Sequence, residues 1–198
     1  MTDQIDAIAA FDGRIAKVEG PVRSGKTEAL LRRAAAAVAA GCAPEDILIE
    51  TSTAEAARVA RRRLVDALAA AGVQDVEDIA GRITVACAQQ VCLAVLETPE
   101  ARAATGRTPR VLAPFECNFF LEDMKTLGTP ARRLRSELGH IKKQWCALAP
   151  EDDWAVGEEK DALELAHRLL GATNAMLEDE VAYLCGRYLQ SDAGAGAR

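Results

Sequence analysis

An eight-residue segment near the N-terminus, GPVRSGKT from Gly20 to Thr27, constrains the fold more than any other part of the sequence. It satisfies the pattern G-x-x-x-x-G-K-[ST] at every fixed position, and an alanine-rich stretch with helical periodicity follows it. Glycines let backbone N–H groups turn towards phosphate oxygens, and the start of a helix adds partial positive charge. The segment therefore predicts a phosphate-binding loop between a strand and a helix.

The chemistry of such a loop assigns different tasks to its side chains and its backbone. Lys26 is expected to reach the β- and γ-phosphates of a nucleotide, and the hydroxyl of Thr27 is expected to coordinate Mg²⁺, so both are candidate catalytic residues. The loop residues whose backbone is expected to surround the phosphates are Gly20, Pro21, Val22, Arg23, Ser24 and Gly25.

Strand-like and helix-like segments alternate in the first half of the chain. The apolar runs at Arg14–Gly20, Glu45–Ser52 and Gly81–Ala88 predict three strands, each followed by a stretch of helical periodicity. Strands that alternate with helices in this way form a parallel sheet with right-handed crossovers. We therefore expect an α/β fold for this half.

The character of the sequence changes after Thr98. A loop is expected first, then one brief strand in RVLAPFE, and then almost only helix from Asn118 to Gln190, packed as a unit distinct from the sheet. The three expected helices span about residues 118–127, 130–148 and 158–190. His140 and His167 fall in charged helical stretches, which predicts surface or structural roles for them.

The composition excludes several function classes. A formal net charge of −6 argues against a surface that grips nucleic acid by charge along its whole length. No stretch approaches the ~18 apolar residues that a membrane helix needs, and the first residues do not resemble a signal peptide. Six scattered cysteines without a C-x-x-C pair predict buried thiols in a reducing cytosol. We therefore expect a cytoplasmic protein without a membrane partner.

Four segments resemble the UvrD/Rep/PcrA-type superfamily 1 DNA helicases. DQIDAIAAF is similar to the N-terminal glutamine motif of that family, and GKTEALLRR is similar to the helix that follows its phosphate-binding loop. ILIETSTAEAARVARRRL resembles motif Ia, in which a strand ending in T-x-T precedes a helix with A-A-R. ITVACAQQVCLAVL is similar to motif Ib.

The resemblance implies an architecture and an activity. Residues 1–113 would form a partial RecA-like P-loop NTPase domain with a parallel sheet, and residues 114–198 an inserted helical subdomain. In the full-length protein, ATP hydrolysis between this domain and a second RecA-like domain of the same polypeptide would drive movement along single-stranded DNA. No D-E-x-x strand and no second such domain is recognised, so we expect an N-terminal region that binds ATP weakly and does not hydrolyse it alone.

The resemblance also implies cofactors and contact residues. ATP and Mg²⁺ would be the cofactors, with Gln4 on the adenine edge. Single-stranded DNA would be the partner, contacted by Thr51 and Thr53 at the end of the motif Ia strand and by Arg58 in the helix behind it.

The sequence departs from the family pattern at several positions. Arg23 replaces a small loop residue, Ser52 an aromatic residue and Glu55 a lysine, while Gln89 and Gln90 stand where relatives carry histidine and serine. The last four changes put the DNA contacts in doubt, because they remove a stacking group and add negative charge. Two alternatives stay open: a helicase-like scaffold whose DNA track has decayed, and a P-loop kinase for a small molecule, which would leave the motif Ia resemblance unexplained.

Overall fold

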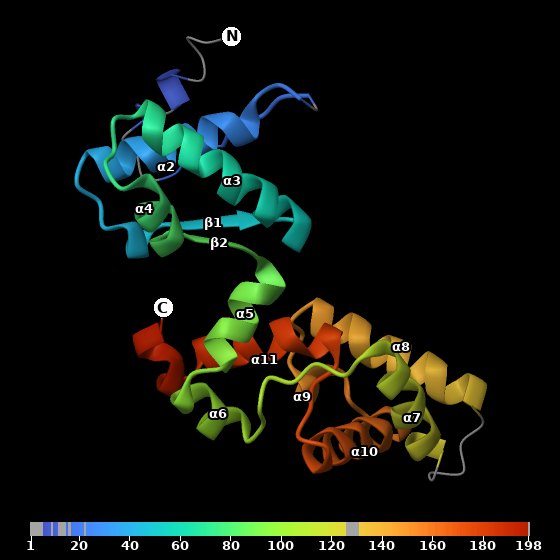
Figure 1. The fold of residues 1–198 in the computed structure, drawn as a ribbon. Helices are drawn as coiled ribbons and strands as arrows, with labels where there is room; N and C mark the ends of the chain where they lie inside the picture. Colours follow the sequence, from blue (N-terminus) through green and yellow to red (C-terminus); the bar gives the residue numbers. More distant parts are fainter. Residues whose placement is uncertain are drawn as a thin grey trace. The chain divides into compact units, whose positions relative to one another are not determined.

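The computed structural model describes residues 6–8, 10–11, 15, 17–21, 23–125 and 131–197. Two compact units divide the chain, Met1–Ala88 and Gln89–Arg198, and Figure 1 shows their elements in sequence colours. The division falls earlier than the boundary expected between residues 113 and 114. The physical reason is that the helices following Ala88 share an apolar core with the C-terminal helices of the second unit.

The first unit is an α/β arrangement with a small sheet. Strands β1 (Leu48–Thr51) and β2 (Thr84–Cys87) pair in parallel, with Leu48 opposite Thr84 and Thr51 opposite Cys87. Parallel strands need a long crossover, which two helices provide here. The helical elements of this unit are, in chain order, α2 (Lys26–Ala39), the 3₁₀ helix η1 (Pro44–Asp46), α3 (Ala54–Ala70) and α4 (Val76–Arg82).

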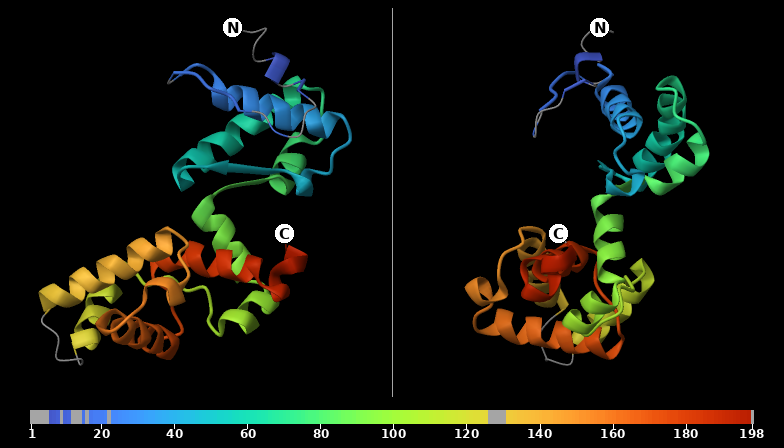
Figure 2. Two further views of the ribbon diagram at one scale, coloured as in Figure 1. Left: turned by 180° about the vertical axis from the view of Figure 1, so that it is seen from behind. Right: turned by 90° about the vertical axis from the view of Figure 1, so that its left-hand side faces the viewer.

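Small side chains let α2 and α3 pack side by side, as the two views of Figure 2 show. Alanines on both helices allow close approach of their backbones, and α3 also packs on β1 and β2. The core that results is apolar throughout, with buried residues that include Leu31, Ala34, Ala35, Ala57, Ala60, Leu64, Leu68 and Val85. This packing fixes the start of α2 relative to α3.

The strand expected at Arg14–Gly20 is absent from the described part of that segment, Ile15 and Lys17–Gly20. Ile15 is exposed, and charged side chains flank Val18, which is only partly buried. So little buried apolar surface cannot hold a strand against a sheet edge. The described residues directly before the glycine-rich loop, Lys17–Glu19, therefore form no strand.

The second unit is helical, and the expectation that residues 118–190 are almost all helix is confirmed for the described residues. The brief strand expected in RVLAPFE is reduced to one isolated parallel bridge between Val111 and Met176. No helix among the described residues has both the length and the apolar character to cross a membrane. The helical elements are α5 (Ala88–Leu96), α6 (Pro99–Thr105), α7 (Pro114–Met124), α8 (Ala131–Cys146), α9 (Glu151–Trp154), α10 (Glu158–Ala172), α11 (Glu178–Gln190) and the 3₁₀ helix η3 (Asp192–Ala197).

Helix α6 forms where a loop was expected. The Thr98 hydroxyl accepts a hydrogen bond from the N–H of Ala101 at 3.3 Å, and Pro99 occupies the first helical position. Gly106, with φ of 67°, ends the helix in the left-handed region. Capping residues at both ends thus outweigh the polar composition that suggested a loop.

The single helix expected at residues 158–190 is two helices, α10 and α11. Asn174 between them has φ of 49°, which no helix accommodates. The N–H of Met176 donates to the carbonyl of Arg110 at 2.8 Å, and its own carbonyl accepts from the N–H of Leu112 at 2.9 Å. Hydrogen bonds to a distant segment therefore replace helical ones and break the helix.

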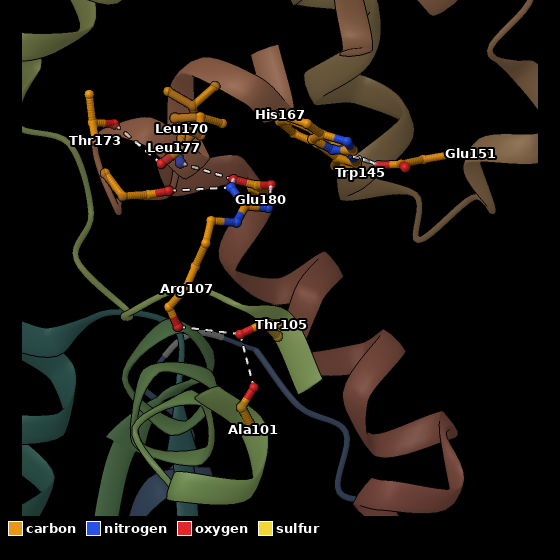
Figure 3. A network of polar contacts seen from close by, with 11 residues as sticks. Ala101, Thr105, Arg107, Trp145, Glu151, His167, Leu170, Thr173, Leu177 and Glu180 are labelled. Atoms are coloured by element: carbon orange, nitrogen blue, oxygen red, sulfur yellow. Dashed lines mark hydrogen bonds and ion pairs between the residues drawn. The ribbon is translucent and has the colours of Figure 1, made fainter. Parts of the chain in front are cut away.

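A buried ion pair connects the segment after α6 to α11. Glu180 is fully buried, and its carboxylate accepts two hydrogen bonds from the guanidinium of Arg107, at 3.1 and 2.5 Å (Figure 3). The same carboxylate accepts from the N–H of Leu177 at 3.3 Å, at the start of α11. A buried carboxylate that loses its cation is strongly destabilising, because one backbone N–H does not compensate for the lost charge pairing and hydration.

We predict that Arg107→Met lowers the free energy of unfolding by about 3–5 kcal/mol, because it leaves the charge of Glu180 buried without a cation. Urea denaturation followed by circular dichroism measures the change. Arg102→Met is the matched control, since Arg102 is an exposed arginine of neighbouring α6. Equal losses in both variants would show that the ion pair does not stabilise the fold.

Aromatic rings surround a second acid in this unit. Glu151 Oε1 accepts a hydrogen bond from Trp145 Nε1 at 2.9 Å and lies 3.2 Å from His167 Nε2, while the rings of Trp145 and His167 stack with centroids 6.1 Å apart (Figure 3). Burial acts to raise the pKa of Glu151, but the hydrogen bonds from His167 and Trp145 outweigh it and hold the pKa below its ordinary value. The structural role expected for His167 agrees with this arrangement.

The lowered pKa of Glu151 makes the stability of the fold depend on pH. Because the pKa of Glu151 is lower in the folded chain than in the unfolded chain, its carboxylate stabilises the fold above about pH 4.3, and this contribution is lost as the pH falls through the lowered value. Glu151→Gln should therefore destabilise the protein at pH 7, and the difference from the native chain should shrink below about pH 4. Urea titrations between pH 3 and 7 test this, with exposed Glu164→Gln as control; a pH-independent difference would contradict it.

Candidate functional site

Helix α2 begins inside the glycine-rich loop with an open N-terminus. Gly25 is its N-cap residue, with φ of 86° and ψ of 10°, and no side chain caps the first turn. The first helical hydrogen bond runs from the N–H of Ala29 to the carbonyl of Gly25 at 2.9 Å. The N–H groups before Ala29 therefore lack helical acceptors, and together with the helix dipole they favour an anion at this point.

The side chain of Lys26 folds back into the loop. Its Nζ donates to the carbonyl oxygens of Gly20 at 2.6 Å and Pro21 at 2.7 Å, with Ser24 Oγ 3.5 Å away. A Cβ atom added to Gly20 would come within 2.7 Å of Ser24 Oγ, so this turn favours glycine. The loop thus closes around the ammonium group of Lys26. Phosphate oxygens can replace the two carbonyl oxygens as acceptors of its hydrogen bonds.

A hollow of about 220 Å³ lies at this end of α2. Lys26 and Thr27 line it, and Thr27 is exposed in the first helical turn. Mg²⁺ bound with a nucleotide typically takes few protein ligands and completes its octahedron with phosphate oxygens and water. One accessible hydroxyl, one lysine and an open helix N-terminus therefore fit a magnesium nucleotide.

The structure describes two of the other expected nucleotide contacts, Arg23 and Pro21. Arg23 has φ of 65°, in the left-handed region that a side chain disfavours, which explains why a small residue is usual at this position. Pro21 supplies one of the carbonyls that hold Lys26. Gln4 and Val22 lie outside the described residues, so the contacts expected of them stay predictions.

The two threonines of the motif Ia segment lie together where β1 ends and α3 begins. Thr51 Oγ1 donates to the carbonyl of Thr53 at 3.0 Å. Thr53 is the N-cap residue of α3, and its hydroxyl accepts from the N–H of Ala56 at 3.1 Å. Both hydroxyls therefore stabilise the turn from strand to helix, whether or not they also meet a ligand.

Arg58, the third expected DNA contact, is exposed on α3 but is not electrostatically free. It forms an ion pair with Glu55 one turn earlier on the helix. Ser52, which stands in place of an aromatic residue, is also exposed. A DNA phosphate approaching this surface would thus meet a guanidinium whose charge is already partly offset.

Two residues of the hollow were not among the expected nucleotide contacts. Glu28 and Arg63 line it together with the motif residues, and they form an ion pair of 2.8 Å. Glu28 also pairs with Arg32 at 2.9 Å, and this i,i+4 spacing is visible in the sequence. No local sequence pattern places Arg63 at the loop, because only the packing of α3 on α2 brings it there.

Gln89 and Gln90 occupy the start of α5. Gln89 Nε2 donates to Glu178 Oε1 of α11 at 3.4 Å, a contact within the second unit. The Gln89 amide is therefore already paired with a carboxylate of its own unit.

A protein-family model matches most of the chain. The family model described as UvrD/REP helicase N-terminal domain matches residues 1–182 of the 198. The matched span contains the glycine-rich loop, the motif Ia segment and most of the helical unit. A comparison with curated proteins gave no match. Because the family match covers far more than half of the sequence, the chain belongs to the family of the UvrD/Rep helicase N-terminal domain.

Proposed function

We propose that the chain is the ATP-binding region of an ATP-dependent DNA helicase that couples ATP hydrolysis to movement along single-stranded DNA. The observation that carries this proposal is the ammonium of Lys26 inside a closed glycine-rich loop, directly at the open N-terminus of α2. Membership of the helicase family supports the same conclusion.

In this proposal different groups of the loop bind different parts of the nucleotide. Gly20 and Gly25 permit the tight backbone, and the N–H groups at the start of α2 donate to phosphate oxygens. Lys26 exchanges its carbonyl acceptors for phosphate and offsets negative charge, while Thr27 holds Mg²⁺. When bound, the metal would polarise the phosphates. Gln4 reads the adenine edge, as the resemblance implies.

The proposal also assigns the remaining parts. Residues 1–113 belong to a partial RecA-like domain, and residues 114–198 form the inserted helical subdomain. Single-stranded DNA lies along Thr51, Thr53 and Arg58, and a second RecA-like domain of the same polypeptide completes the catalytic site in the cytoplasm. By itself the chain binds ATP weakly without hydrolysing it at a useful rate.

A second function has one observation in its favour. Glu55 pairs with Arg58 on the surface that should face DNA, where a like-charged phosphate backbone would be repelled by the carboxylate. A helicase-like scaffold whose DNA track has decayed would show this pattern. It would keep the phosphate-binding loop and lose affinity for nucleic acid.

Nucleotide binding tests the main proposal. A fluorescent ADP analogue titrated with Mg²⁺ should bind the native chain, and Lys26→Ala should weaken binding by at least about tenfold, since it removes a charge-assisted contact. Lys143→Ala, which removes an exposed lysine of α8, serves as control. Equal binding by the native chain and Lys26→Ala would eliminate the phosphate-loop function.

DNA binding separates the helicase from the scaffold. Fluorescence anisotropy with an oligo-dT probe should show weak binding that falls steeply with salt, and Arg58→Gln should reduce the slope of log affinity against log salt by about 0.7. Arg168→Gln, an exposed arginine of α10, is the control. Identical slopes for the native chain and both variants would favour the scaffold.

A further inference from the structure

Glu28 occupies an unusual place for a carboxylate, because it lines the hollow proposed to receive phosphate. It lies in the first turn of α2, directly after Lys26 and Thr27. Its Oε1 accepts from Arg32 Nε at 2.9 Å, and its Oε2 accepts from an Arg63 terminal nitrogen at 2.8 Å. One carboxylate therefore ties a guanidinium of its own helix and one of α3 to the rim of the hollow.

The charge of this carboxylate is well maintained. The hydrogen bond from Arg32 lowers the pKa of Glu28 most, burial opposes it, and Arg63 lowers the pKa further. Arg32 also pairs with Asp6 at 3.1 Å, so its charge is shared between two acids. Arg63, by contrast, lines the hollow itself and has Glu28 as its acidic partner there.

A phosphate in the hollow would change this balance. Its negative charge would be repelled by Glu28 and attracted by Arg63, and both groups face the same small volume. The Arg63 side chain is partly exposed, so its guanidinium can turn without unpacking the core. Glu28 keeps Arg32 as a partner if Arg63 leaves. The same guanidinium is thus within reach of two competing anions.

We propose that Arg63 exchanges Glu28 for a phosphate of the bound nucleotide, so that Glu28 is a competitor that weakens nucleotide binding and Arg63 is a second phosphate-binding cation. This inference rests on the proposed nucleotide site. Arg63 belongs to α3, so the exchange would bring a side chain of a second helix to the nucleotide held at the start of α2.

The exchange predicts opposite effects for its two partners. In titrations of the fluorescent ADP analogue with Mg²⁺, Arg63→Gln should weaken binding about tenfold, because a charge-assisted hydrogen bond to phosphate is lost. Glu28→Gln should strengthen binding by about two- to tenfold, because the competing charge is gone. In the double variant Glu28→Gln/Arg63→Gln, the change in binding free energy should differ from the sum of the two single changes, because the two side chains interact directly.

Control variants separate a loss of the Arg63 exchange from a loss of the nucleotide site itself. Arg62→Gln removes a neighbouring exposed arginine of α3, and Glu55→Gln removes a carboxylate of α3 that pairs with Arg58. Lys26→Ala reports on the phosphate loop itself, and circular dichroism confirms that each variant is folded. If Glu28→Gln does not fold, Arg63→Gln against Arg62→Gln decides alone.

Each outcome has one meaning. Lys26-dependent binding with Arg63→Gln equal to Arg62→Gln would overturn the exchange and leave the nucleotide site standing. Weaker binding by Glu28→Gln would also overturn it, because Glu28 would then support the nucleotide rather than compete with it. Absence of Lys26-dependent binding in the native chain would overturn both proposals.

Discussion

The hydrogen bonds from the Lys26 ammonium to the carbonyls of Gly20 and Pro21 are the interaction on which the site depends. They close the loop and place a cation at the open N-terminus of α2. The two carbonyl oxygens accept hydrogen bonds from the ammonium group, and phosphate oxygens can take their place. A loop built in this way is organised for an anion before any ligand arrives.

The packing of α2 on α3 connects the glycine-rich loop to the motif Ia segment. Alanine-rich faces bring α2 and α3 into close contact, and Glu28 bridges the two helices at the rim of the hollow through Arg63. The Thr53 hydroxyl fixes the start of α3. The start of α2 and the end of β1 are therefore connected through the packed pair of helices α2 and α3.

Two groups of polar contacts connect elements of the second unit. Arg107 and Glu180 join the segment after α6 to α11, and Glu151 joins the start of α9 to Trp145 and His167. Such contacts contribute little when replaced as a pair but cost much when one partner is removed alone. They favour this arrangement of helices over alternatives with a similar apolar pattern.

The sequence alone determined the glycine-rich loop before α2, the two parallel strands within Glu45–Ser52 and Gly81–Ala88, and the helical character of the second half. These follow from local rules: glycine spacing, apolar runs and helical periodicity. Tertiary structure decided the rest. The described residues Ile15 and Lys17–Gly20 lack the buried surface to form a strand, Met176 breaks a long helix because distant backbone groups bind it, and Arg63 reaches the loop because α3 packs on α2. Each of these depends on partners far away in the chain, which no local pattern can reveal.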